Sequence, residues 1–417
     1  MMRKLFQSFQ SDRLVKIGLQ NQEIAIERSP KFGIYWPELD ILRGIAAVSM
    51  IVNHLGYRTL SPEQLSYGLT SHLVFMGSFA PVLFFFITGV GYGIQSRNPP
   101  KRNHWAIVLN KVGILILADL FMHWSAGRLL GLDFFGFIGI ACIVLEIIRH
   151  SRQPILYALV GLVIISGLRY GIGSYLTLTE SLGYGRGILG WLLGTFSPEG
   201  ISYPLSPWMA YPLFGYIVGY ATVQYSTLIK KWWLRVTFSL SLFAILPMIC
   251  GMILASKGAP FFRWGTVSLS YYIVSFSAIL VALSIAMLIS KVRPLKMIEK
   301  ILSLPGIASF TIVPIHYFLI YLLDIANLNK LDSLSFYAIG LATLLISFLI
   351  AKRVNNFSQH LPIIRHQSLV YWSLVGIVVL SGTLVFSINK ENLGLTMLAR
   401  TLGQTTLGTS QKISPQS

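Results

Sequence analysis

The side chains with the clearest chemical potential are four ionisable groups inside long apolar stretches: His54, Asp119, His123 and His316. An ionisable side chain in the middle of a membrane-spanning helix costs about 2.5–3.5 kcal/mol to insert, so it is a functional candidate by default. A neutral imidazole, with an unperturbed pKa of about 6.5, takes a proton from a hydroxyl or an amine near neutral pH. We therefore expect these four residues to be catalytic.

Asp119 and His123 are four residues apart, which places them on one face of a helix. There the carboxylate can orient the imidazole and raise its basicity, although such a pair would equally stabilise a helix end. His316 has a similar alternative as a core histidine bonded to a neighbouring backbone carbonyl. Spacing alone leaves both interpretations open.

A second polar group lies toward the opposite end of the same stretches. Arg43 precedes His54 by eleven residues, so at 100° per residue the two share a helix face, about 16 Å apart along the axis. Asp40 lies on that side as well, and Lys111 also falls toward the opposite end from the histidines. This polarity suits a site whose donor and acceptor arrive from opposite sides of a membrane. It would equally suit a proton relay in a transporter, and an Arg43–Asp40 pair would suit a surface anchor.

The composition requires a membrane protein. The chain has 417 residues, of which 54% are hydrophobic and only 12% charged, against about a quarter charged in soluble domains. The mean hydropathy is +0.66. These values exclude a soluble enzyme, a disordered chain and a disulfide scaffold. The two cysteines, Cys142 and Cys250, lie in apolar runs and are expected to be free thiols.

The apolar runs predict an all-α, polytopic membrane bundle of about eleven helices, because open strands cannot satisfy their backbone groups in lipid. We expect a cytoplasmic N-terminal segment (1–40), a membrane domain (41–386) and a disordered C-terminal tail (387–417). The predicted helices are 41–57, 71–95, 104–124, 130–148, 155–172, 206–223, 234–254, 266–289, 301–323, 334–351 and 368–386.

The distribution of basic residues predicts the orientation. With the N-terminus in the cytoplasm, 21 of the 33 basic residues fall in cytoplasmic segments and 10 in outer segments. Cytoplasmic loops carry the excess of lysine and arginine in membrane proteins. The net charge of +18 therefore indicates topology, and we predict no nucleic-acid partner.

Smaller motifs predict local structure. Gly215 and Gly219 have the spacing of closely packed helices. Asp133 opens a helix, where the dipole favours an acid, and Glu146 with Arg149 forms an ion pair near a helix end. The sequence contains no metal-ligand spacing, no Gly-x-Ser-x-Gly elbow and no Walker loop. We therefore predict no metal site.

Several segments resemble membrane-bound acyltransferases. Residues 38–46 (Glu-Leu-Asp-Ile-Leu-Arg-Gly-Ile-Ala), followed by His54, match the Arg-x10-His pattern of the acyltransferase-3 family. They are similar too to the bacterial relatives of heparan-α-glucosaminide N-acetyltransferase. Further segments resemble this second branch: Phe79–Gly89, Leu132–Ile140, Tyr203–Trp208 with Gly215 and Gly219, and Ile315-His316.

The resemblance implies an enzyme that transfers an acyl group, usually acetyl from acyl-coenzyme A, to a sugar across the membrane. His54 would be the general base or a transient acyl carrier, supported by Asp119, His123 and His316. Arg43, with Asp40 and Lys111, would steady the negative charge of the donor on the cytoplasmic side. The expected partners are the lipid bilayer of the plasma membrane and a carbohydrate acceptor. The alternatives are a transporter or flippase of a lipid-linked or soluble sugar, and a structural subunit of a polysaccharide assembly.

The eleven-helix arrangement can be tested with a topology reporter. An odd number of spans with a cytoplasmic N-terminus places a reporter fused after Ser417 outside the cytoplasm. We expect alkaline phosphatase, which is active only outside the cytoplasm, to be active in this fusion. Activity of a green fluorescent reporter there, with inactive phosphatase, would contradict the arrangement.

Overall fold

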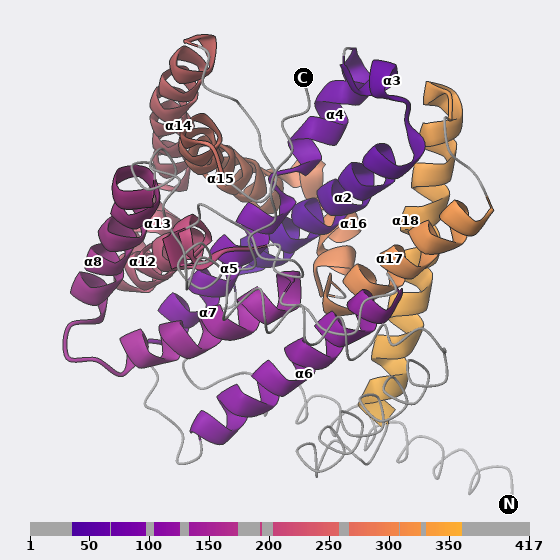
Figure 1. The fold of residues 1–417 in the computed structure, drawn as a ribbon. Helices are drawn as coiled ribbons and strands as arrows, with labels where there is room; N and C mark the ends of the chain where they lie inside the picture. Colours follow the sequence, from indigo (N-terminus) through magenta and orange to yellow (C-terminus); the bar gives the residue numbers. More distant parts are fainter. Residues whose placement is uncertain are drawn as a thin grey trace, which may run out of the picture.

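The computed structural model is a bundle of α-helices (Figure 1). No strand occurs among the residues that the structure describes, which confirms the all-α class. The described residues are 36–66, 68–96, 104–125, 133–173, 192–193, 203–257, 267–307, 309–326 and 331–360. The predicted helix 368–386, the predicted tail 387–417 and most of the N-terminal segment lie outside this range.

Ten of the eleven predicted helices overlap helical segments of the structure. In chain order the segments are α2 (Pro37–Thr59), α3 (Pro62–Ser66), α4 (Leu69–Gly77), α5 (Ala80–Gln95), α6 (His104–Ser125), α7 (Phe134–Arg149), α8 (Pro154–Gly167), the π-helix η1 (Leu168–Gly173), α11 (Leu205–Trp208), α12 (Ala210–Gln224), α13 (Ser226–Lys231), α14 (Trp233–Ser256), α15 (Leu269–Lys291), the 3-10 helix η2 (Arg293–Leu295), α16 (Lys296–Ile307), α17 (Ser309–Ile325) and α18 (Ser333–His360).

Six segments of the described chain are long and apolar enough to cross a membrane. They are Pro37–Thr59, Leu69–Gln95, Pro154–Gly173, Trp233–Ser256, Leu269–Lys291 and Ser333–Arg353. Prolines stand in the first turns of α2, α5 and α8, at Pro37, Pro81 and Pro154, where the missing N–H costs no helical hydrogen bond. The chain is therefore a multi-pass membrane protein, and the total of eleven spans stays a prediction.

Several predicted helices are divided in the structure, among them 71–95 and 301–323. The predicted helix 71–95 consists of α4 and α5, separated by Ser78 and Phe79. The predicted helix 301–323 is replaced by α16 and α17. Pro305 and Gly306 precede this second break, and both residues disfavour a continuous helix. A hydropathy pattern does not register such breaks, because the flanking residues are apolar on both sides.

The helix α2 is the central element of the described bundle. It contacts α4, α5, α15, α16, α17 and α18, and it runs through the middle of the view in Figure 1. Of its apolar window, 61% is buried, against 11% for α14 and 6% for the segment Pro154–Gly173. The peripheral helices α8 and α14 therefore present their apolar side chains to lipid, whereas α2 contacts protein along its length.

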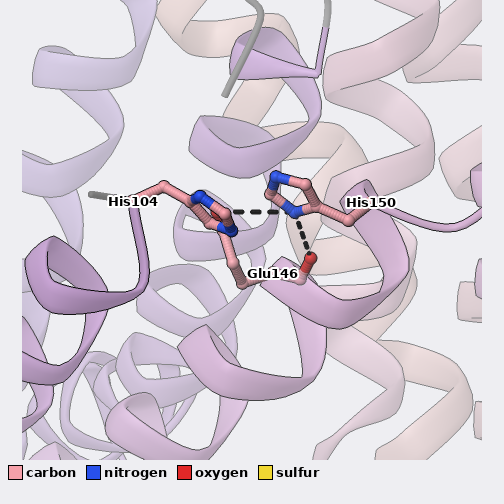
Figure 2. Close-up of side chains that lie close together, drawn as sticks. All are labelled: His104, Glu146 and His150. Atoms are coloured by element: carbon pink, nitrogen blue, oxygen red, sulfur yellow. Dashed lines mark hydrogen bonds and ion pairs between the residues drawn. The ribbon is translucent and has the colours of Figure 1, made fainter. Parts of the chain in front are cut away.

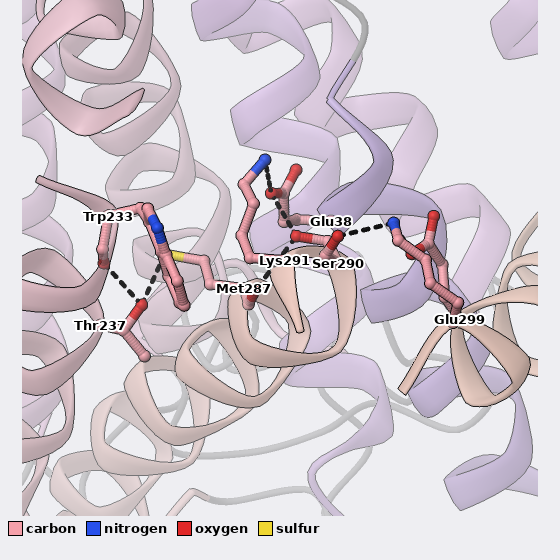
Figure 3. A network of polar contacts seen from close by, with 8 residues as sticks. Glu38, Trp233, Thr237, Met287, Ser290, Lys291 and Glu299 are labelled. Atoms are coloured by element: carbon pink, nitrogen blue, oxygen red, sulfur yellow. Dashed lines mark hydrogen bonds and ion pairs between the residues drawn. The ribbon is translucent and has the colours of Figure 1, made fainter. Parts of the chain in front are cut away.

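The first turn of α2 is bonded to the end of α15. Glu38 accepts a hydrogen bond from Ser290 Oγ at 2.6 Å and an ion pair from Lys291 Nζ at 3.2 Å (Figure 3). Glu38 is 1% exposed, so its charge needs these partners. The contact fixes the axial position of α2, and with it the depth of every other side chain on this helix.

Glycines bring α5 and α12 into backbone contact. A Cβ atom at Gly89 or Gly93 would overlap the backbone of α12 at Pro212 or Tyr216. A Cβ atom at Gly215 would overlap the carbonyl oxygen of Phe86 on α5, and Gly219 meets the same helix. The predicted close packing of Gly215 and Gly219 is thus confirmed. Small residues allow the approach that dispersion forces need between helices in lipid.

This contact predicts opposite effects for two glycines of α5. Gly89→Ala places a methyl group against Pro212, whereas Gly91→Ala places one in open space. We expect Gly89→Ala to destabilise the protein by about 1–3 kcal/mol and Gly91→Ala to leave it unchanged or to stabilise it by about 0.5–1 kcal/mol. Thermal unfolding of the two purified variants in one detergent measures the difference. A Gly89→Ala melting temperature equal to that of Gly91→Ala would contradict the packing.

Candidate active site

His54 and His316 form a hydrogen-bonded pair across the bundle. His54 lies on α2 and His316 on α17, and His54 Nδ1 is 3.0 Å from His316 Nε2. The two rings are stacked, with centroids 5.3 Å apart and planes within 16°. Tyr317 joins them, because its hydroxyl oxygen is 3.4 Å from His54 Nε2. The structure thus brings together two of the four residues predicted to be catalytic.

The backbone sets the direction of this hydrogen-bond chain. His316 Nδ1 is 3.2 Å from the carbonyl oxygen of Ile312, and a carbonyl oxygen only accepts, so Nδ1 carries the hydrogen. Nε2 of a neutral His316 is then an acceptor, and it accepts from Nδ1–H of His54. The remaining lone pair of His54 therefore lies on Nε2. This is the arrangement that a general base requires, with a partner that fixes the tautomer.

A small cavity lies beside His54 on the side of Tyr317. Its wall is formed by five helices and by Tyr203, two residues before α11. The lining residues are Met50, Asn53, His54, Gly77, Ala80, Pro81, Phe134, Tyr203 and Tyr317. Most of these side chains are apolar or aromatic, whereas His54 and Tyr317 bring polar atoms. The side-chain amide of Asn53 has a structural partner, because its Nδ2 donates to the carbonyl oxygen of Val74 at 2.8 Å. The cavity therefore combines one base with walls that exclude water.

Asp119 builds one wall of this cavity indirectly. Its carboxylate accepts hydrogen bonds from the backbone N–H groups of Asp133, Phe135 and Gly136, at 2.8, 2.9 and 2.7 Å. These are the first N–H groups of α7, which have no partner within their own helix. An anion at this end is also favoured by the helix dipole. Asp119 thus fixes the start of α7 and with it Phe134, which lines the cavity.

The predicted pairing of Asp119 with His123 stays a prediction. The side chain of His123 lies outside the described part of the structure, although its backbone belongs to α6. Asp133 is the N-cap residue of α7, at the helix start where the sequence predicted an acid. The cap was invisible in the spacing of side chains, because its donors are backbone groups of another helix.

The residues expected to contact the acyl donor, Arg43, Asp40 and Lys111, do not line the cavity beside His54. Arg43 Nη1 bonds Asp40 Oδ1 at 2.8 Å, and the Arg43 side chain is 36% exposed. Both are on α2, toward its N-terminal end. Lys111 lies on the neighbouring α6, where its Nζ is 5.9 Å from the ring centre of Tyr92. Arg43 and Asp40 form the pair that the sequence predicted, and Lys111 is exposed.

Sequence reasoning singled out only His54 among the residues of the cavity wall, and it missed the three aromatic side chains Phe134, Tyr203 and Tyr317. Tyr203 contacts Phe134 and Trp208 through its ring, with centroid distances of 6.2 and 4.9 Å. Its position in the segment Tyr203–Trp208 was visible in the family pattern. Tyr317 directly follows His316, and both side chains reach His54 although they are about 100° apart around the helix axis.

The order of these segments agrees with a known family. The family model described as heparan-alpha-glucosaminide N-acetyltransferase, catalytic, matches residues 36–251, slightly more than half of the chain. The chain belongs to this family. No curated protein matches it. The heparan-α-glucosaminide N-acetyltransferase match begins one residue before α2 and includes His54, Asp119 and the glycines of α5 and α12. His316 and Tyr317 lie after it, so their contact with His54 is information that the structure adds.

The cap of α7 can be tested through a series at one position. Asp119→Ala removes all three hydrogen bonds, and Asp119→Asn keeps one acceptor oxygen without the charge. Buried N–H groups left unpaired cost about 1–3 kcal/mol each, so we expect the melting temperature to fall in the order Asp119, Asn, Ala. Thermal unfolding in detergent measures this order. Equal stability of the wild-type protein and Asp119→Ala would show that the cap is not structural.

Proposed function

We propose that the protein is a membrane acetyltransferase that moves an acetyl group from acetyl-coenzyme A to the amine or hydroxyl group of a sugar. The observation that carries this proposal is the lone pair on His54 Nε2, held beside a small cavity by the bond from Nδ1 to His316. The family match supports acetyl transfer to a sugar amine, since the family is described by an N-acetyltransferase of a glucosaminide.

The proposed chemistry is direct transfer with a general base. The acceptor nitrogen or oxygen attacks the thioester carbon of acetyl-coenzyme A, and its proton passes to His54 Nε2. The carbon–sulfur bond breaks, the coenzyme A sulfur leaves as a thiolate, and the imidazolium returns the proton to it. The products are the acetylated sugar and coenzyme A, and His54 is restored. No oxidant and no metal takes part in this step.

His316 and Tyr317 complete the base. His316 is a positioning residue, because it holds the His54 ring through Nδ1 and is itself held by the carbonyl oxygen of Ile312. It is 0% exposed, so the pair cannot rotate freely into solvent. The hydroxyl of Tyr317, 3.4 Å from His54 Nε2, occupies the position that an acceptor hydroxyl or amine takes during the reaction.

The donor is proposed to approach from the N-terminal end of α2. Arg43, partly exposed and bonded to Asp40, would contact the negative charge of coenzyme A, with Lys111 as a second cation. The cavity at His54 lies eleven residues further along α2, about 16 Å away. A pantetheine arm must cover such a distance to deliver its thioester. With the N-terminus in the cytoplasm, the donor would come from the cytoplasm and the sugar from the outer side of the plasma membrane.

The role of His54 can be tested by substitution. His54→Ala removes the base, and general bases contribute about 10²- to 10⁴-fold to rate. We expect this loss in the transfer of label from acetyl-coenzyme A to glucosamine by protein reconstituted in lipid. His72→Ala is the matched control, because His72 is an exposed histidine on α4 that bonds only the carbonyl oxygen of Gly68 among the described contacts. It should keep full activity.

Three outcomes of the same assay would contradict the proposal. Full turnover by His54→Ala would remove His54 from the mechanism. Label that stays on the denatured wild-type protein and is absent from His54→Ala would replace direct transfer by an acyl-enzyme. Movement of sugar across the vesicle membrane without any acetylated product would indicate a transporter.

A further inference from the structure

A second polar cluster lies at the other end of the α6–α7 pair. His104 begins α6, Glu146 is in the last turn of α7, and His150 directly follows α7 (Figure 2). One nitrogen of each ring and one carboxylate oxygen all lie within 4.8 Å of one another. The two imidazoles are stacked, with centroids 4.3 Å apart and planes within 19°. None of these residues contacts the cavity beside His54.

Glu146 is buried with an unused acceptor. Its side chain is 2% exposed, and Oε2 is 3.5 Å from Arg149 Nη1, which confirms the predicted ion pair. The other oxygen, Oε1, has no hydrogen-bond partner among the described residues. It is 3.6 Å from His150 Nδ1. A buried carboxylate oxygen without a hydrogen bond is costly, so this atom points to a missing ligand on the side of the histidines.

His150 has the tautomer of a metal ligand. Its Nδ1 is 2.9 Å from the backbone carbonyl oxygen of Glu146, and because the carbonyl accepts, the hydrogen is on Nδ1. The lone pair of the neutral ring is then on Nε2. Because Nδ1 is the ring nitrogen that lies 3.6 Å from Glu146 Oε1, the ring has to reorient for Nε2 to bind an ion beside that oxygen. Metal-bound histidines typically donate their other ring N–H to a carbonyl or a carboxylate in this way.

We propose that His104, Glu146 and His150 bind one divalent transition-metal ion of the zinc class. Two imidazole nitrogens and one carboxylate oxygen are a ligand set that suits zinc, with water completing the coordination. Ligands of a tetrahedral ion with bonds of about 2.0–2.1 Å lie about 3.3 Å from one another. Closing the present cluster onto an ion therefore requires the three side chains to approach one another.

The surrounding charges favour a cation at this place. The cluster lies at the C-terminal end of α7, where unpaired carbonyl groups give a partial negative charge of about half an elementary charge. Glu146 contributes a full negative charge, and Arg149 occupies only its Oε2. The ion would supply the partner that Oε1 lacks among the described residues.

The position of the cluster gives the ion a structural role. Because Asp119 of α6 caps the start of α7, an ion held by His104 of α6 at the far end would join the two helices at both ends. The 16 residues of α7 separate the two ends by about 24 Å. The metal would therefore stabilise the α6–α7 pair without taking part in acyl transfer.

The site can be tested by metal content. The full-length protein, purified in detergent without a histidine tag, is stripped with a chelator, incubated with ZnCl2 and desalted. We expect one zinc per chain by elemental analysis, and a rise in melting temperature on adding zinc. Titration with CoCl2 gives the absorption spectrum that reports nitrogen and oxygen ligands and their geometry. Neither readout depends on acetyltransferase activity, so this proposal stands or falls apart from the proposed function.

Three substitutions and one control distinguish a specific site. His104→Ala, His150→Ala and Glu146→Gln should each weaken zinc binding by more than the roughly 10- to 100-fold that loss of a second-shell partner costs, whereas His72→Ala should bind normally. Size-exclusion profiles of the zinc-free variants establish that each one is folded. Less than a tenth of a zinc per wild-type chain, or binding unchanged in His104→Ala and His150→Ala, would overturn the proposal. In that case the cluster is an ion pair between Glu146 and a protonated His150.

Discussion

The need to pair buried polar groups within an apolar bundle governs this structure. The helix α2 carries a glutamate, an aspartate, two arginines, an asparagine and a histidine through the protein. Lipid offers no partner to such groups, and an unpaired polar group there costs several kcal/mol. Each one is bonded to a neighbour: Glu38 to Ser290 and Lys291, Asn53 to Val74. The central position of α2, with six helices around it, gives its polar side chains partners within the protein.

The same constraint makes the candidate site rigid. His54 is held by His316, and His316 by a backbone carbonyl of its own helix, so the tautomer and the ring plane follow from the fold. The helices behind this pair approach one another through glycines, which transmit small shifts because no flexible side chain lies between the backbones. Asp119 has a similar effect at a distance, since it places Phe134 by holding the first turn of α7. Catalytic precision here is proposed to come from backbone contacts as much as from the histidines.

Much of the fold could be predicted from the sequence, because apolar runs, proline positions and charge bias are local signals. Periodicity placed Arg43 and His54 on one face of α2, and topology placed His54 and His316 at a similar depth. The contact between these histidines could not be predicted, because nothing local relates residues 262 positions apart. The capping role of Asp119 could not be predicted for another reason: side-chain spacing points to His123, whereas the cap is made with backbone N–H groups of a different helix. Part of the cluster at Glu146 follows from the sequence, since His150 is four residues later. His104 joins the cluster only through the packing of α6 against α7.

The separation of His54 and His316 along the chain has a consequence for biosynthesis. A ribosome adds roughly 5–20 residues per second, so the 262 residues between the two histidines take about 13–52 s to make. During that time α2 has entered the membrane, but its histidine lacks the partner that the finished protein supplies. The translocon, early helices or trapped water must provide a temporary one. The site is thus assembled only when α17 arrives, and a nascent chain that stalls before this helix contains most of the family's matched segment without a paired base.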